Sequence, residues 1–206
     1  MPRRNRVDPW GDLHAVADRG GLTGNRGCVV DDAEQVVRHH ASRAWISCVL
    51  EYRDQRSPLA APRHWTPLFF LDDAVALAAG HRPCALCRRP DYRAYRDAVT
   101  ASLGASRPLL AVELDARLSA ERLRPGRGLE RAADRVTWDA PYADLPDGAV
   151  VIMERAAWLV RGDELRRFSF AGWGSAILRP TSGMATVLTP PTSYAALVYG
   201  FVPSLS

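Results

Sequence analysis

The chain has 206 residues, of which 47% are hydrophobic and 24% are charged, a balance typical of a globular protein with a packed core. No run of eighteen apolar residues occurs, so we expect no transmembrane helix, and the arginine-bearing N-terminus lacks the apolar segment of a secretory signal. All 27 basic residues are arginines, and the net charge of +4 permits a polyanionic partner. We therefore expect a cytoplasmic protein with no membrane partner.

The first segment with a clear period runs from Ala44 to Arg53 and reads AWISCVLEYR. Its apolar and polar residues alternate, which is typical of a half-buried β-strand. The face that we expect to point toward the core carries Ile46, Cys48, Leu50 and Tyr52. The predicted strand therefore presents one cysteine to the interior.

A short helix and a tight turn are predicted just before a Cys-x-x-Cys motif. Asp72 or Asp73 is placed to cap the helix, because an aspartate at that position accepts hydrogen bonds from the first turn. The helix runs through Ala79 and ends at Gly80, which adopts the left-handed conformation of a helix stop without strain. Pro90 then opens a second helix, because proline is tolerated in a first turn.

This second helix has two different faces. One stripe is apolar and is expected to lie in the core: Tyr92, Tyr95, Val99 and Leu103. The other stripe is basic and carries Arg89, Arg93 and Arg96.

The sequence pattern after residue 110 is first helical and then, from Val136, typical of strands. A third helix is predicted from about Ala111 to Arg124, and after Val136 short apolar runs alternate with turn signals, as in meandering strands. A last helix is expected to be capped by Thr192 and to stop at Gly200. The fold class predicted is α+β, with a small zinc-stabilised N-terminal module and a β-rich C-terminal portion.

The cysteines are the main candidates for metal ligands in this sequence. Cys84 and Cys87 form a Cys-x-x-Cys motif on a turn, a spacing that places two thiolates on one Zn²⁺. Cys48 is the best third ligand, because we expect its strand face to point inward. The fourth ligand is Cys28, His64 or His81; Cys28 is favoured because it completes a set of soft thiolates. A redox-active pair and buried inert thiols are the alternatives.

The segment DDAVALAAGHRPCALCRRPDY resembles the second half of the Ada-type metal-binding domain of bacterial alkyl-DNA repair regulators. That family combines an alanine-rich helix, Ala-Ala-Gly, an aromatic residue, Arg-Pro-Cys, a second cysteine and a proline. The matching residues are Ala78, Ala79, Gly80, Arg82, Pro83, Cys84, Cys87 and Pro90, with His81 in place of the aromatic residue. The resemblance covers residues 72–92 and implies zinc held by cysteine thiolates and contact with the DNA backbone.

The chain also departs from this family. The first ligand pair of the family is Cys-x₃-Cys, and one of its thiolates accepts a methyl group from a DNA phosphotriester. Here Cys48 stands alone, with Tyr52 four positions later. If Cys28 supplies the fourth ligand, the site is closed and structural; methyl transfer requires an exposed zinc-bound thiolate, for which Cys48 is the candidate.

Five arginines around the motif are the predicted nucleic-acid-binding residues, since a basic helix beside a zinc turn can lie along phosphates. They are Arg82, Arg88, Arg89, Arg93 and Arg96. The alternative is a solvated face with locally paired charges. The carboxylates of the third predicted helix are candidates for a divalent-metal site: Glu113, Asp115 and Glu121.

The sequence thus predicts an Ada-like zinc-binding module at residues 1–110, a helical connector at 111–135 and a small β-rich domain at 136–206. The function expected is a zinc-binding protein that interacts with nucleic acid, DNA in particular, in DNA damage recognition or repair. The alternatives are an enzyme, either a thiol alkyl acceptor or a metal-dependent nuclease, and a zinc-stapled structural or interaction module. The residues leave open whether the protein is an enzyme.

Overall fold

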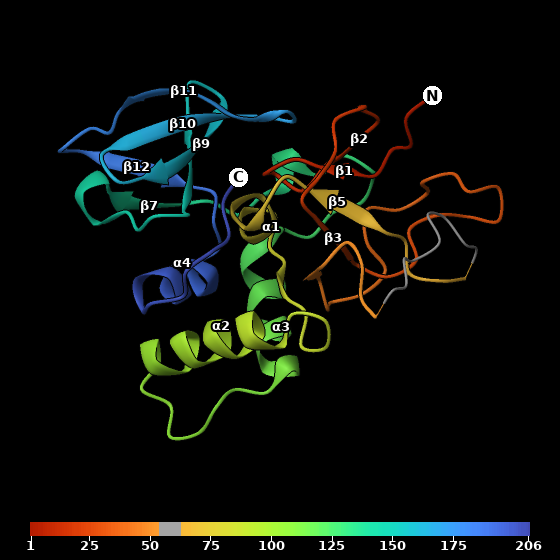
Figure 1. Ribbon diagram of the computed structural model, residues 1–206, viewed down its shortest axis with the longest axis horizontal. Helices are drawn as coiled ribbons and strands as arrows, with labels where there is room; N and C mark the ends of the chain where they lie inside the picture. The colour runs from red at the N-terminus through yellow and green to blue at the C-terminus, as the bar shows by residue number, and fades with distance from the viewer. Residues whose placement is uncertain (54–62) are drawn as a thin grey trace.

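The computed structural model describes residues 1–53 and 63–206, and within them four α-helices and two six-stranded sheets (Figure 1). The mixed α+β class that the sequence predicts is confirmed at this level. The helices are α1 (Asp73–Ala78), α2 (Arg89–Ser102), α3 (Ala111–Arg122) and α4 (Pro191–Val198).

The first sheet is built from short strands of the N-terminal part, in the order β2-β1-β5-β3-β4-β6. Its strands are β1 (Arg6–Val7), β2 (Leu13–His14), β3 (Leu22–Asn25), β4 (Ile46–Cys48), β5 (Leu68–Phe70) and β6 (Arg82–Pro83). The strands β4 and β6 pair in parallel, with Ser47 opposite Pro83. Because parallel strands end at the same edge, Cys48 and the residue after β6 are brought side by side.

The second sheet is an antiparallel arrangement from the C-terminal part, in the order β11-β10-β9-β8-β12-β7. Its strands are β7 (Trp138–Pro141), β8 (Val150–Met153), β9 (Ala156–Arg161), β10 (Glu164–Ser169), β11 (Gly172–Leu178) and β12 (Met184–Val187). Short turns join β8 to β9, β9 to β10 and β10 to β11, as the turn signals between the apolar runs predict.

The predicted orientation of the strand between Ala44 and Arg53, which contains β4, is wrong. Trp45 is fully buried and Ser47 is 1% exposed, whereas Cys48 is half-buried and Leu50 is 46% exposed. Both faces of this segment carry apolar residues, so alternation alone does not identify the inner face. The large indole of Trp45 determines which face is buried, because burying that side chain removes the most apolar area from water.

Helix α1 begins and ends as predicted. The carboxylate of Asp72 accepts a hydrogen bond from the Val75 N–H at 3.1 Å, which caps the helix. Gly80 has a φ of +85°, and its N–H donates to the carbonyl of Leu77 at 2.9 Å. This left-handed stop directs the chain into β6.

Helix α1 lies between the two sheets (Figure 1). Val75 and Ala76 belong to a core cluster with the first sheet, while Ala74 and Ala78 pack with residues of β8 and β9. The indole N–H of Trp173, on β11, donates to Asp72 at 2.6 Å. The small side chains of α1 therefore let both sheets approach one helix closely.

Helices α2, α3 and α4 share a further core with the second sheet. Tyr92 and Tyr95 are buried there, as predicted, whereas Leu103 at the end of the same stripe is 43% exposed. The predicted cap of the last helix is wrong: Thr192 lies inside α4, where its N–H and hydroxyl both donate to Glu121. The domain boundaries at 110 and 135 stay a prediction.

Among the described residues, no helix has both the length and the apolar character required to span a bilayer.

Candidate metal centre

Three of the four cysteines converge at the edge of the first sheet. The Sγ atoms of Cys48, Cys84 and Cys87 all lie within 4.8 Å of one another. A tetrahedral zinc ion with Zn–S bonds of about 2.3 Å holds its sulfurs roughly 3.8 Å apart, so a small contraction of this cluster suffices for coordination. The geometry and the softness of the donors are compatible with a metal ion.

The backbone places these thiols before any metal binds. The N–H of Cys84 donates to the carbonyl of Ser47 at 2.9 Å, which extends the pairing of β6 with β4. The N–H of Arg88 donates to the Cys84 carbonyl at 3.2 Å and closes the turn that carries both cysteines of the motif. The N–H of Leu86 points at the Cys84 Sγ, 3.4 Å away. Such N–H···S contacts stabilise a thiolate.

Arg88 is the side chain that ties this turn to the rest of the protein. It is 5% exposed, and its two Nη atoms donate to the carboxylate of Asp73 at 2.6 and 2.8 Å. It also donates to the Ser47 hydroxyl at 3.0 Å and to Asp91 at 2.9 Å. Burial alone lowers the pKa of an arginine, but here the paired carboxylate of Asp73 raises the pKa of Arg88. One guanidinium thus connects β4, α1 and α2 behind the cysteines.

The three thiols interact through hydrogen bonds, so the protonation of each affects the others. Hydrogen bonding from Cys48 is the main cause that lowers the pKa of Cys84 to about 5, and the same contact raises the pKa of Cys48 above its ordinary value. Burial raises the pKa of Cys87. These directions favour one thiolate beside protonated neighbours, and a divalent ion that binds here would displace those protons.

Cys28, the favoured fourth ligand, lies outside this group. Its thiol donates to the carbonyl of Val30 at 3.4 Å, in a turn that β3 leads into. Neither of the other two candidates, the exposed His64 and the fully buried His81, belongs to the group of ligand atoms that lie within 4.8 Å of one another. Residues 54–62 lie outside the described part of the chain and contain no cysteine or histidine. The described residues thus bring three soft ligands to the site.

Two of the five predicted phosphate-binding arginines are internal. Arg82 is 4% exposed and forms a bidentate ion pair with Asp115 at 2.8 and 2.9 Å, which joins β6 to α3. Arg88 is held in the ion pair with Asp73 described above. Neither is available to an external phosphate in this structure, because each guanidinium forms bidentate hydrogen bonds to a buried carboxylate. Arg89 and Arg93 are exposed, and Arg96 is half-buried beside Asp97 at 2.7 Å.

The carboxylates of α3 do not form a second metal site among the described residues. Glu113 pairs with Arg107 at 2.7 Å, Asp115 with Arg82, and Glu121 accepts from Thr192. Each carboxylate points to a different neighbour, so the arrangement does not support the nuclease alternative.

A scan against models of protein families, a search of curated proteins and a search of solved structures found no match to this chain.

Proposed function

We propose that Cys48, Cys84 and Cys87 bind one zinc ion and that the resulting module presents α2 to nucleic acid. The observation that carries the zinc assignment is the convergence of three sulfurs within 4.8 Å from β4 and from the turn before α2. Thiolate ligands favour zinc over magnesium or calcium, and zinc accepts a tetrahedral site without redox chemistry. Zinc would neutralise the thiolates and stiffen the turn from which α2 begins.

The fourth coordination position is not filled by a thiolate or an imidazole of the described residues. A zinc site with three protein ligands keeps a place for water or for an exogenous group. This composition differs from the four-cysteine set that the Ada-type resemblance implies. A zinc ion with an open fourth position could bind a reacting group as well as stabilise the fold.

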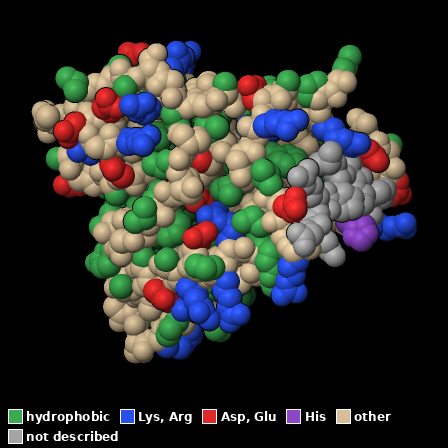
Figure 2. Space-filling model, in the orientation of Figure 1, with side chains coloured by type: hydrophobic (Ala, Val, Ile, Leu, Met, Phe, Trp, Pro, Cys, Tyr) green, Lys and Arg blue, Asp and Glu red, His purple; other side chains and the backbone are tan. Residues whose placement is uncertain are grey.

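The nucleic-acid surface that we propose is the exposed face of α2. Arg89 and Arg93 are exposed, and no described residue forms an ion pair with either of them. Arg96 adds a third positive charge, partly compensated by Asp97. Basic side chains gather over the region of α2 in Figure 2. Guanidinium groups that lack a carboxylate partner can bind phosphates without first breaking an ion pair. The Ada-type resemblance suggests DNA, and damage recognition or repair, as the setting.

Salt-dependent binding to a DNA duplex tests this surface. Each phosphate contact adds about 0.9 to the slope of log K against log salt, so the double variant Arg89→Ala/Arg93→Ala is expected to lower the slope by roughly 2. Arg161→Ala/Arg167→Ala is the matched control, because it removes two exposed arginines from the second sheet. Fluorescence anisotropy between about 50 and 200 mM salt measures both slopes.

Equal loss in the two double variants would mean that only total charge matters, and absence of DNA binding would leave a zinc-stapled structural module. Either result contradicts the proposed surface.

Alkyl transfer is a second candidate, favoured by the partial exposure of Cys48 and Cys87. The Cys48 thiolate, held by zinc if the ion binds as proposed, would be the nucleophile, and the alkyl carbon would pass from a phosphotriester oxygen to its sulfur, leaving a phosphodiester. Mass spectrometry after incubation with methylated DNA tests it: one methyl group on Cys48 supports the transfer, and unmodified cysteines refute it.

A further inference from the structure

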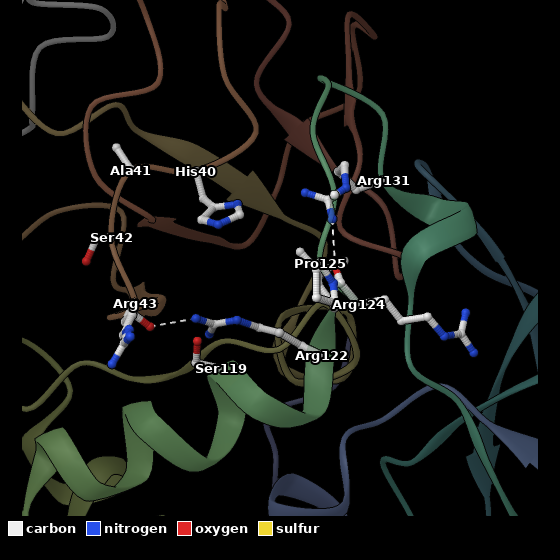
Figure 3. Close-up of a pocket in the computed structure, with 11 residues that line it drawn as sticks. His40, Ala41, Ser42, Arg43, Ser119, Arg122, Arg124, Pro125 and Arg131 are labelled. Carbon is white, nitrogen blue, oxygen red and sulfur yellow. Dashed lines mark hydrogen bonds between the residues drawn. The ribbon is translucent and has the colours of Figure 1, made fainter.

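A second feature of the molecule, separate from the cysteines and from α2, is a pocket of about 490 Å³ at the end of α3 (Figure 3). It is lined by His40, Ala41, Ser42, Arg43, Ser119, Arg122, Leu123, Arg124, Pro125, Gly126 and Arg131. Four of these residues are arginines, and none carries a carboxylate. The lining is therefore strongly cationic.

Arg122 brings a buried charge to the wall of this pocket. It is 3% exposed and extends from α3 toward the 40–43 segment (Figure 3). Its Nη atoms donate to the carbonyls of Gly80 at 3.2 Å and Arg43 at 2.7 Å, and its guanidinium lies 3.9 Å from the centroid of the Trp45 ring. These partners are all neutral. Burial is the main cause that lowers the pKa of Arg122 to about 9, so the group is still charged at neutral pH.

Two more buried arginines lie behind it. Arg26 is fully buried, with its guanidinium 4.6 Å from the same Trp45 ring, and it donates to the Gly11 carbonyl at 2.7 Å. Arg135 is 3% exposed and donates to the carbonyls of Ala78 and Leu188. The Nε of Arg26 and the Nε and Nη1 of Arg135 have no hydrogen-bond partner among the described residues.

The nearby carboxylates compensate these three arginines only in part, through charge at a distance: Asp8 and Asp12 act on Arg26 and Arg135, and Asp115 acts on Arg122. Asp12 accepts hydrogen bonds from the backbone N–H groups of Arg131 and Ala132 at 2.6 and 3.2 Å. Asp8 accepts the N–H of Asp12 and faces His14 at 2.8 Å. Within the described ranges, no carboxylate forms an ion pair with Arg26, Arg122 or Arg135. Buried charge without a counterion is unfavourable, so an anion in the adjoining pocket is stabilised electrostatically.

The exposed part of the pocket lining also carries positive charge. Arg43 and Arg124 are exposed, and among residues 1–53 and 63–206 neither has an ion-pair partner. Arg131 is already engaged by Asp134 and by the carbonyl of Arg124. His40 is exposed, and partial burial together with the charges of Arg26 and Arg122 lowers the pKa of its ring.

We propose that this pocket binds a small molecule through a phosphate group. Arg122 would lie at its inner wall and Arg43 and Arg124 at its mouth, with the hydroxyls of Ser42 and Ser119 as further donors. A phosphate dianion matches planar guanidinium forks in charge and geometry. The volume lies within the range of small-molecule sites and exceeds what an inorganic phosphate ion fills. The major groove of a duplex admits a helix such as α2, whereas a pocket of this volume is typical of a small-molecule site.

Calorimetric titration with inorganic phosphate and with ribose 5-phosphate tests the proposal. The double variant Arg43→Gln/Arg124→Gln removes two exposed charges without disturbing the core, and we expect it to weaken binding of both probes at least about 10-fold. Arg161→Gln/Arg167→Gln, on the second sheet, is the matched control and should bind as the wild type does.

Three outcomes would overturn the proposal: no binding of either probe, equal weakening in the control, or unchanged binding in the Arg43→Gln/Arg124→Gln variant. A fourth arm uses a 5′-phosphorylated oligonucleotide. If it binds in an Arg43- and Arg124-dependent manner while ribose 5-phosphate does not, the pocket is a nucleic-acid site, which also overturns the small-molecule assignment. Because the variants lie away from α2, failure here leaves the DNA surface of α2 untouched.

Discussion

The substitution His81→Phe is expected to stabilise the protein. His81 is fully buried, with ring centroids 5.1 Å from Trp45 and 4.6 Å from Phe70, and neither ring nitrogen makes a hydrogen bond to a described residue. A buried polar group without a partner costs about 1–3 kcal/mol. Phenylalanine keeps a flat ring at the site and removes both nitrogens. We expect a gain of about 1 kcal/mol or more at pH 7, after allowance for the slightly larger ring.

The same substitution should reduce the acid sensitivity of the fold. Burial, with the nearby charges of Arg26 and Arg122, holds the pKa of His81 well below 6.5 in the folded protein. Below pH 6.5 the unfolded chain gains a proton on this histidine that the folded chain does not bind, so stability falls as the pH falls. One such group loses about 1.4 kcal/mol per pH unit, or roughly 2 kcal/mol between pH 7 and pH 5. The variant lacks this loss.

Urea unfolding followed by tryptophan fluorescence at pH 7 and pH 5 measures both effects. The advantage of His81→Phe over wild type should widen by about 2 kcal/mol at the lower pH. His64→Phe is the control, because His64 is exposed, and it should show no such widening. A constant difference between the two pH values, or a variant less stable than wild type at pH 7, would refute the interpretation of His81 as a neutral, unpartnered ring.

Three further predictions concern Arg88, Gly80 and the proposed zinc ion. Arg88→Ala leaves the Asp73 carboxylate buried without its partner and should lower the free energy of unfolding by about 3–5 kcal/mol, whereas Arg89→Ala, one residue further on and exposed, should leave it nearly unchanged in the same urea assay. Gly80→Ala should lower the melting temperature in calorimetry, because a Cβ there meets a side-chain carbon of Arg122 at 2.9 Å and the residue has a φ of +85°. Removal of the proposed zinc ion with a chelator should lower the melting temperature, and added zinc should restore it.

The cysteine cluster was largely predictable because its signal is local. A Cys-x-x-Cys motif between a helix stop and a proline defines a turn, and each of these features is set by a few neighbouring residues. Cys48 was added on the expectation of an inward-facing strand. That orientation is wrong, yet the thiol still reaches the cluster, because the parallel pairing of β4 with β6 brings the two strand ends together. Cys28 had no such local constraint, and it lies elsewhere.

The arginines show the limit of sequence reasoning. Arg82 and Arg89 have the same charge and the same sequence neighbourhood, but one is buried and the other exposed. The difference comes from Asp115, which becomes a neighbour of Arg82 only when α3 packs beside β6. The cationic pocket was missed for the same reason. Its residues come from distant segments, and no spacing in the sequence indicates that Arg43, Arg122 and Arg131 line one pocket.

Elemental analysis of the metal content of the purified protein tests the three-cysteine zinc centre. Wild type is compared with serine variants of each cysteine. The account predicts one zinc ion per chain in the wild type and in Cys28→Ser, whose thiol lies outside the cluster, and loss of zinc in Cys48→Ser, Cys84→Ser and Cys87→Ser. A wild-type protein without zinc, zinc retained in Cys48→Ser, or zinc lost in Cys28→Ser would contradict the proposed three-cysteine centre.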